Sequence, residues 1–272
     1  MMRVRKKPRT FYERMSMSSP QPADFYQRSM EILEAAGISF LVGGAYAIRV
    51  HAGIERDTKD FDVMLRPADV DAAILAFRTA GYRAEVAFPH WIAKAHHGEL
   101  FLDLIYNSGN GLCPIDDEWF AFAQPATVLG RKVKLCPPEE IIWQKAFIME
   151  RERFDGADIA HLLRSCQGRL DWTRLLRRFG CDGRVLLAHL FLAQFVYPGI
   201  EDLVPQWVLD QLLAQGGKIA DPHLCNGPLL SRGQYLPDVE RWGFRDARLE
   251  RGVISEAALE VWTAAIPSTA SP

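Results

Sequence analysis

The sequence predicts an α+β protein, with a small mixed sheet and flanking helices followed by a mostly helical C-terminal part. Two observations indicate this class. Between residues 23 and 135, short apolar strand-like runs are interspersed with amphipathic helical patterns. From residue 136 onward, apolar residues recur mainly at helical spacing. We therefore expect a flexible N-terminal arm over residues 1–22, a sheet-containing domain over 23–135 and a mostly helical domain over 136–272.

Signals for helices and strands alternate along the chain. The elements expected, in order, are a helix over 22–36 stopped by Gly37, a strand over 38–42, a short helix to His51, a strand over 60–65, a helix over 67–81, strands over 82–87, 91–95 and 100–106, a hairpin over 126–135 and a helix opened by Pro137 and Pro138. A Gly/Asn-rich loop over 107–118 follows the third of the later strands, a position where substrate contacts are often placed.

The composition fits a cytoplasmic globular protein of one or two domains. Of 272 residues, 49% are hydrophobic, which is enough to bury a sizeable core. The 32 basic and 34 acidic residues nearly balance, so no overall polycation points to nucleic acid, although a local basic patch stays open. The five cysteines form no Cys-x-x-Cys pair, which favours a reducing compartment over a disulfide scaffold or a zinc site.

No segment is expected to span a membrane. Residues 1–22 are basic and then Ser/Pro-rich, without the apolar core of a secretory signal, which leaves a mobile arm or an organellar transit peptide. The most apolar later run, over 185–196, is too short to cross a bilayer.

Two aspartates lie close together at the end of the apolar stretch over 40–65. In a strand over 60–65, Asp60 and Asp62 would share one face about 6.6 Å apart, with Phe61 and Val63 on the other. Two carboxylates on one face repel each other, and Mg²⁺ is commonly held by one or two carboxylates together with substrate phosphates. The pair therefore indicates a divalent cation, with a solvated strand end as the alternative.

A glycine pair, Gly43 and Gly44, lies between the strand over 38–42 and the short helix. Glycine lets the backbone approach a phosphate closely, and the helix that follows offers its first N–H groups to the same anion. A simple turn is the alternative. Glycines and carboxylates together describe a triphosphate held on magnesium.

The whole stretch resembles the signature of the DNA polymerase beta-like nucleotidyltransferase superfamily, in the branch of small bacterial enzymes that includes aminoglycoside adenylyltransferases and related toxin–antitoxin proteins. The resemblance covers residues 25–165 and implies a role for each matching position, with Asp60 and Asp62 binding metal, and Gly43, Gly44, Arg56 and Thr58 binding nucleotide. This chain has Ala45 where the family's glycine motif often ends in serine, which removes one hydroxyl contact to phosphate and leaves the backbone contacts intact.

A third carboxylate, Asp103, lies within the apolar run over 100–105. A buried charge needs a partner, and a metal ion is the strongest candidate; an edge strand facing water is the alternative. The resemblance places the family's third carboxylate at this position, on a strand beside the one that carries Asp60 and Asp62.

A lysine, Lys145, falls within the apolar stripe of the helix that starts at Pro137, a stripe expected to continue to Ile148 and Met149. Such a lysine either extends its amine to water or meets an anion. The resemblance implies a lysine close to the triphosphate. After the helix, we expect an ion pair between Arg153 and Asp158, and Asp155 as a helix N-cap.

The resemblance implies a Mg²⁺-dependent enzyme with residues 23–135 as its catalytic domain. Asp60, Asp62 and Asp103 would hold one or two Mg²⁺ ions that bind an NTP, and Asp103 would orient or deprotonate an acceptor hydroxyl that attacks the α-phosphorus and expels pyrophosphate. The expected reaction transfers AMP from ATP to a small molecule, as the near-neutral charge and the loop over 107–118 suggest.

Two other functions stay open. A toxin-like nucleotidyltransferase would modify tRNA or a protein, which the basic cluster over residues 3–9 and the run Arg174, Arg177, Arg178 favour slightly. A non-catalytic nucleotide-binding or regulatory protein would keep the fold, but the presence of all three carboxylates speaks against it.

Overall fold

The computed structural model describes residues 22–266, apart from 57, 59, 201 and 216–220. The arm predicted over 1–22 therefore lies, except for Pro22, outside the described residues, as does the basic cluster over 3–9.

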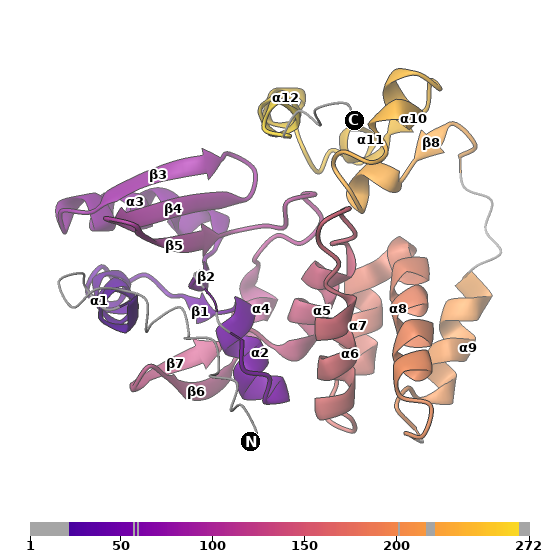
Figure 1. Ribbon diagram of the computed structural model, residues 1–272, viewed down its shortest axis with the longest axis horizontal. Coiled ribbons are helices and arrows are strands. Elements are labelled where there is room, and N and C mark those ends of the chain that lie inside the picture. The colour runs from indigo at the N-terminus through magenta and orange to yellow at the C-terminus, as the bar shows by residue number, and fades with distance from the viewer. Residues whose placement is uncertain (1–21, 57, 59, 201, 216–220, 267–272) are drawn as a thin grey trace, which may run out of the picture.

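One mixed sheet organises the first half of the chain (Figure 1). Its strands, in chain order, are β1 (Leu41–Val42), β2 (Asp62–Met64), β3 (Arg83–Phe88), β4 (Ile92–His97), β5 (Leu100–Ile105), β6 (Gln124–Val128) and β7 (Arg131–Leu135). Their order across the sheet is β3-β4-β5-β2-β1-β7-β6. Strand β2 pairs parallel with β5 and antiparallel with β1, and β1 pairs parallel with β7. The mixed sheet is confirmed, and β2 lies at its centre.

Helices flank the sheet and continue beyond it. The helices of the first half are α1 (Pro22–Ala35), α2 (Gly44–Ala52), α3 (Val70–Thr79), which follows the 3₁₀ turn η2 (Pro67–Asp69), and α4 (Asp117–Ala121). Next come α5 (Pro138–Ala146), α6 (Gly156–Ser165), α7 (Trp172–Phe179), the 3₁₀ turn η3 (Gly180–Asp182), α8 (Gly183–Val196) and α9 (Gln206–Gln215). Helices α5 to α9 stand side by side next to the sheet (Figure 1).

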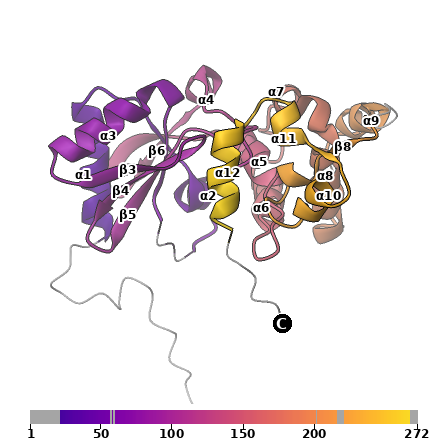
Figure 2. The same ribbon diagram turned by 90° about the horizontal axis from the view of Figure 1, so that it is seen from above.

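The last described segment packs back over the sheet edge. It contains β8 (Leu224–Cys225), η4 (Gly227–Leu229), α10 (Leu236–Glu240), β9 (Arg245–Asp246), α11 (Ala247–Glu250) and α12 (Glu256–Ala264). Figure 2 shows α12 between the sheet and the helical part. The Asn110 amide donates to the Leu229 carbonyl at 2.7 Å, and the Trp262 ring stacks on Trp91. The loop over 107–118 is therefore in contact with the C-terminal segment.

A continuous hydrophobic core runs from Phe25 on α1 to Leu212 on α9. It passes through position 135 without interruption, since Leu135, Cys136 and Ile141 all belong to it. The division of the chain at 135 stays a prediction. A smaller cluster is formed by Ala258 and Trp262 of α12 together with Ile254.

Three local expectations are wrong in detail. Asp60 precedes β2 rather than lying in it, so the spacing of a regular strand does not hold between Asp60 and Asp62. Helix α5 ends at Ala146, so Ile148 and Met149 follow the helix and do not extend its stripe. Strand β1 has two residues, because Ile38, Ser39 and Phe40 approach the sheet without pairing.

Within the described part of the chain, residues 172–196 form the one helical stretch that is long and apolar enough to cross a membrane. Its mean hydropathy is 1.3, and the core helix of a soluble protein meets the same test. The stretch is interrupted at Gly180, between α7 and α8, and it contributes Leu175, Leu186 and Leu190 to the core.

Candidate active site

A pocket of about 270 Å³ opens beside the start of α2 and collects most of the predicted site residues. Of those, it is lined by Gly44, Arg56, Thr58, Asp60, Asp62 and Lys145. The rest of the lining comes from Ala45, Ile48, Arg153, Asp155 and Asp158. Gly43 and Asp103 lie outside the lining. A second hollow of about 400 Å³, near Phe40 and Lys134, contains none of the predicted residues.

The glycine pair brings α2 into direct contact with β2. The Gly43 N–H donates to the Asp62 carbonyl at 3.0 Å. Gly44 has a φ of +52°, and a Cβ atom there would lie 1.6 Å from Asp62 Oδ2. Only glycine leaves room for that carboxylate against the start of the helix. The N-cap residue of α2 is Gly43, which has no side chain to cap the first N–H groups of the helix.

Thr58 acts on the backbone around Asp60. Its hydroxyl donates to the Asp60 carbonyl at 3.0 Å and accepts from the Asp60 N–H at 3.1 Å. This local turn holds Asp60 in place just before β2, where no strand pairing fixes it. The contact that the structure shows for Thr58 is thus to protein, and its predicted role in nucleotide binding stays a prediction.

Asp62 carries the most perturbed carboxyl of the pocket. Burial raises its pKa to about 6, and the negative charges of Asp103 and Asp60 act in the same direction, against Lys145 and Arg153. Among the described residues, no hydrogen bond or ion pair reaches the Asp62 carboxylate. It is a half-buried carboxyl next to other carboxyls, with room for a cation.

Asp103 has a protein partner instead. The Lys94 ammonium lies 2.5 Å from Asp103 Oδ1, and the two residues are direct partners in the β4–β5 ladder. Burial raises the pKa of Asp103 in spite of the hydrogen bond from Lys94, which lowers it. The expectation that this buried charge needs a partner is met by an amine, and the metal-binding role of Asp103 stays a prediction.

Lys145 is clamped by two aspartates from the start of α6. Its Nζ lies 2.5 Å from Asp155 Oδ2 and 2.9 Å from Asp158 Oδ2. Asp158 also pairs with Arg56, while Arg153 binds Asp155 through its Nε and Nη2 atoms. The predicted Arg153–Asp158 ion pair is wrong, because Arg56 and Lys145 occupy Asp158.

Asp155 occupies the N-cap position of α6 but makes no side-chain cap bond, because its carboxylate binds Lys145 and Arg153 instead. Burial alone would raise the pKa of Asp155, but Arg153 and Lys145 together lower it to about 2.

The donor set suits a magnesium–triphosphate more than a bare metal ion. In the described ranges, no group of three or more His, Cys, Asp or Glu side chains is placed to hold a metal by itself. Mg²⁺ needs only one or two carboxylates when phosphates and water complete its shell, and Asp60 and Asp62 are two carboxylates of the pocket lining that could fill this role. Gly44, at the start of α2, has no side chain that would keep a phosphate away from the backbone.

Lys94, Asp155 and Asp158 were not among the predicted site residues. A signal existed for the two aspartates, since Lys145 and Arg153 lie close to them in the sequence and a half-buried lysine needs an anion. Lys94 is identified by the register between β4 and β5, which places it opposite Asp103. Hydrophobic periodicity in the sequence does not give this register.

A pocket that joins Asp62 of the central strand to a helix opened by glycines fits a nucleotidyltransferase. The chain belongs to the family described as nucleotidyl transferase of unknown function (DUF2204), which matches residues 23–179. The match ends with α7, so it includes the sheet, the pocket and α5 to α7. None of the curated proteins compared with the chain matches it.

Several solved structures are similar at low sequence identity. The antibiotic-resistance factor ANT(2'')-Ia is 17% identical, with 64% of this chain and 96% of that chain covered and a TM-score of 0.41. A lincomycin-bound lincosamide antibiotic adenylyltransferase, LnuA, is 17% identical over 52% of this chain and 94% of that chain, with a TM-score of 0.37. An antigenic nucleotidyltransferase-like protein from Paracoccidioides brasiliensis is 16% identical over 64% and 93%, with a TM-score of 0.36.

Proposed function

We propose that this protein transfers a nucleoside monophosphate, AMP in the first instance, from a Mg²⁺-bound NTP to a hydroxyl of a small-molecule acceptor, with release of pyrophosphate. The observation that carries the proposal is the contact between Gly44 and Asp62. It sets a carboxylate that has no partner among the described side chains against the start of a helix, where phosphates and their cation would be bound together.

The donor half of the reaction rests on the pocket. Asp60 and Asp62 would hold Mg²⁺, which neutralises charge on the phosphates and on the leaving pyrophosphate when it is bound. The glycines and the first N–H groups of α2 bind the β- and γ-phosphates through the backbone. Lys145 and Arg56 each carry positive charge on the pocket wall, and in this proposal both would turn from their aspartates toward a phosphate.

Asp103 is assigned to the acceptor. It lies on β5, level with Asp62 on β2, so both side chains leave the sheet on the same face. Its carboxylate would accept a hydrogen bond from the acceptor hydroxyl and orient it for in-line attack.

The test of the donor half is isothermal titration with Mg²⁺ and each NTP. The wild type is compared with the combined Asp60→Asn and Asp62→Asn variant and with Asp71→Asn, which changes an exposed aspartate on α3. Wild type and Asp71→Asn should bind the nucleotide, and the double variant should not. Equal binding by all three proteins would remove the assignment.

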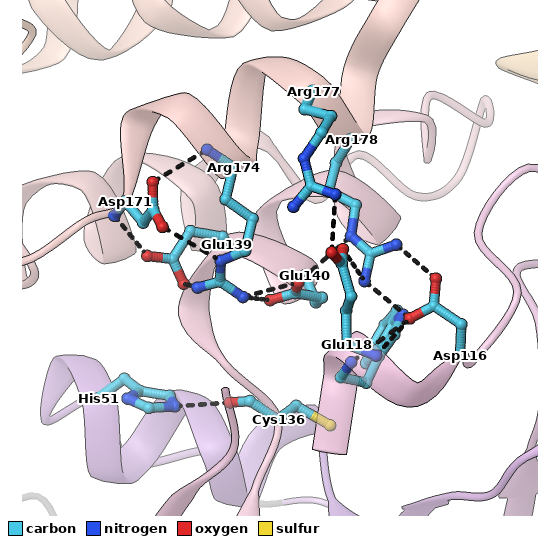
Figure 3. Close-up of polar contacts among 11 residues, drawn as sticks. His51, Asp116, Glu118, Cys136, Glu139, Glu140, Asp171, Arg174, Arg177 and Arg178 are labelled. Atoms are coloured by element: carbon cyan, nitrogen blue, oxygen red, sulfur yellow. Dashed lines mark hydrogen bonds and ion pairs between the residues drawn. The ribbon is translucent and has the colours of Figure 1, made fainter. Parts of the chain in front are cut away.

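The arginine run Arg174, Arg177 and Arg178 gives less support to an RNA or protein acceptor than its sequence suggests. Arg174 and Arg178 point into an ionic network rather than to solvent (Figure 3). Arg174 binds Glu139 at 2.5 Å and Glu140 at 2.8 Å, and Arg178 binds Asp116 at 2.5 Å. The third member, Arg177, is exposed but paired with Glu118. The run is therefore not a free basic patch for RNA.

The acceptor class is decided by a transfer assay. The protein is incubated with α-labelled ATP and either a metabolite mixture or total RNA, and the Asp60→Asn and Asp62→Asn variant serves as control. We expect the label in small molecules. Label found in RNA alone would favour the toxin-like function.

A further inference from the structure

Three charged side chains form a row across the centre of the sheet. Asp62 on β2 is the ladder partner of Asp103 on β5, and Asp103 is the ladder partner of Lys94 on β4. Directly paired residues leave a sheet on the same face, so the order of charges on that face is carboxylate, carboxylate, ammonium.

The ammonium is held tightly at the end of this row. Lys94 Nζ lies 2.5 Å from Asp103 Oδ1 and 4.3 Å from the centre of the Phe101 ring. The ring face favours a cation over a neutral amine. Asp103 is only 9% exposed, and Lys94 occupies its Oδ1 atom.

The pocket itself stops short of this pair. Asp60 and Asp62 line the pocket, whereas Asp103 and Lys94 do not. A divalent ion bridging Asp62 and Asp103 would have to displace the ammonium of Lys94 or lie against it, and two cations at such a distance repel each other.

We propose that Lys94 is the built-in counter-cation of Asp103, in the place of a second divalent ion, so that this site takes one metal ion, on Asp60 and Asp62. Lys94 is then a positioning residue, which keeps the Asp103 carboxylate free of metal and aimed at the acceptor side. The inference rests on the proposed function, because it presumes that Asp60 and Asp62 hold a metal with the nucleotide.

The experiment counts metal ions. Mn²⁺ is titrated into the full-length protein in the presence of a non-hydrolysable ATP analogue, with free Mn²⁺ followed by electron paramagnetic resonance. Wild type should bind one ion per chain, and Lys94→Met should bind a second. Lys94→Arg, which keeps the positive charge, should behave as wild type, and the combined Lys94→Met and Asp103→Asn variant should return to one ion.

A second metal count, on the Asp103→Asn variant, does not depend on whether Lys94→Met folds. In the otherwise wild-type chain, Asp103→Asn should leave the number of bound ions unchanged. Circular dichroism of each variant confirms that it is folded. Two ions on the wild type, reduced to one by Asp103→Asn, would overturn the inference and leave the proposed function standing. One ion on a folded Lys94→Met variant would also overturn it, and no ion on the wild type would remove both proposals.

Discussion

Gly44 and Asp62 are packed so closely that a single added carbon on the glycine would overlap the carboxylate, at 1.6 Å from Oδ2. This contact joins the start of α2 to the central strand. It determines both where the helix begins and how much of Asp62 remains open to the pocket.

Gly44→Ala should therefore abolish binding of the magnesium–nucleotide complex, because the new methyl group pushes Asp62 away from the start of α2. A matched control exists at the other end of the same helix. Gly53 has a φ of +70° with no atom within 4 Å of an added Cβ, so Gly53→Ala carries the backbone strain without the collision. That strain costs about 1–2 kcal/mol. Titration of Mg²⁺ and ATP into both variants separates the two effects, and similar losses in both would contradict the prediction.

Lys145→Met should weaken ATP binding by roughly 10- to 100-fold, which corresponds to the loss of one charge-assisted hydrogen bond to phosphate. The variant should also be less stable, because Asp155 and Asp158 each lose a partner, although Arg153 and Arg56 remain beside them.

Lys134→Met, which changes an exposed lysine on β7 outside this pocket, is the control for Lys145→Met. Fluorescent ATP-analogue binding is measured well below the unfolding temperature of each protein. Affinity of Lys145→Met equal to that of the control would assign the lysine to structure alone.

Mg²⁺ should stabilise the protein more at about pH 7.5 than at about pH 5, because the pKa of Asp62 is raised to about 6 in the metal-free fold. The folded chain keeps a proton there that the unfolded chain, with an ordinary carboxyl pKa near 3.9, has released. The stability from this protonated Asp62 is complete below about pH 4 and is lost as the pH rises through about 6. Above that pH, a cation is needed to neutralise the charge.

Thermal unfolding with and without Mg²⁺ at the two pH values measures this effect. In Asp62→Asn, which has no proton to lose, the Mg²⁺-induced shift should be small at both. A shift in the wild type that is independent of pH would contradict the prediction.

Arg174→Met should lower the free energy of unfolding by about 3 kcal/mol or more, because it leaves Glu139 and Glu140 buried without their main partner. Arg178 still reaches Glu140 at 3.3 Å, which limits the loss. Arg177→Met removes an arginine from the same helix whose side chain is 58% exposed, and should cost at most about 1 kcal/mol. Urea denaturation of both variants gives the comparison, and equal losses would show that the buried network contributes little.

Much of the fold could be predicted from local signals. Gly37 follows the first helix as expected, and Gly130 lies in the turn of the hairpin predicted over 126–135; both have positive φ values. Asp60 could not be placed correctly, because its position depends on a Thr58 hydroxyl contact that competes with strand pairing.

Lys94 was missed for a similar reason. The strand over 91–95 is predicted to end before His96, whereas β4 runs to His97 and pairs it with Leu100. This tighter turn sets the register and brings Lys94 opposite Asp103. A small error in a turn thus hid the partner of a buried charge.

Helix α5 links the ionic network to the pocket. Glu139 and Glu140 in its first turn are held by α7, and Lys145 in its last turn stands about 8 Å further along the axis. A short helix is stiff, so any tilt at the anchored end moves the lysine amine at the other end. A substitution at Arg174 that lowers stability without unfolding the chain would therefore tilt α5, move Lys145 and change the affinity for nucleotide.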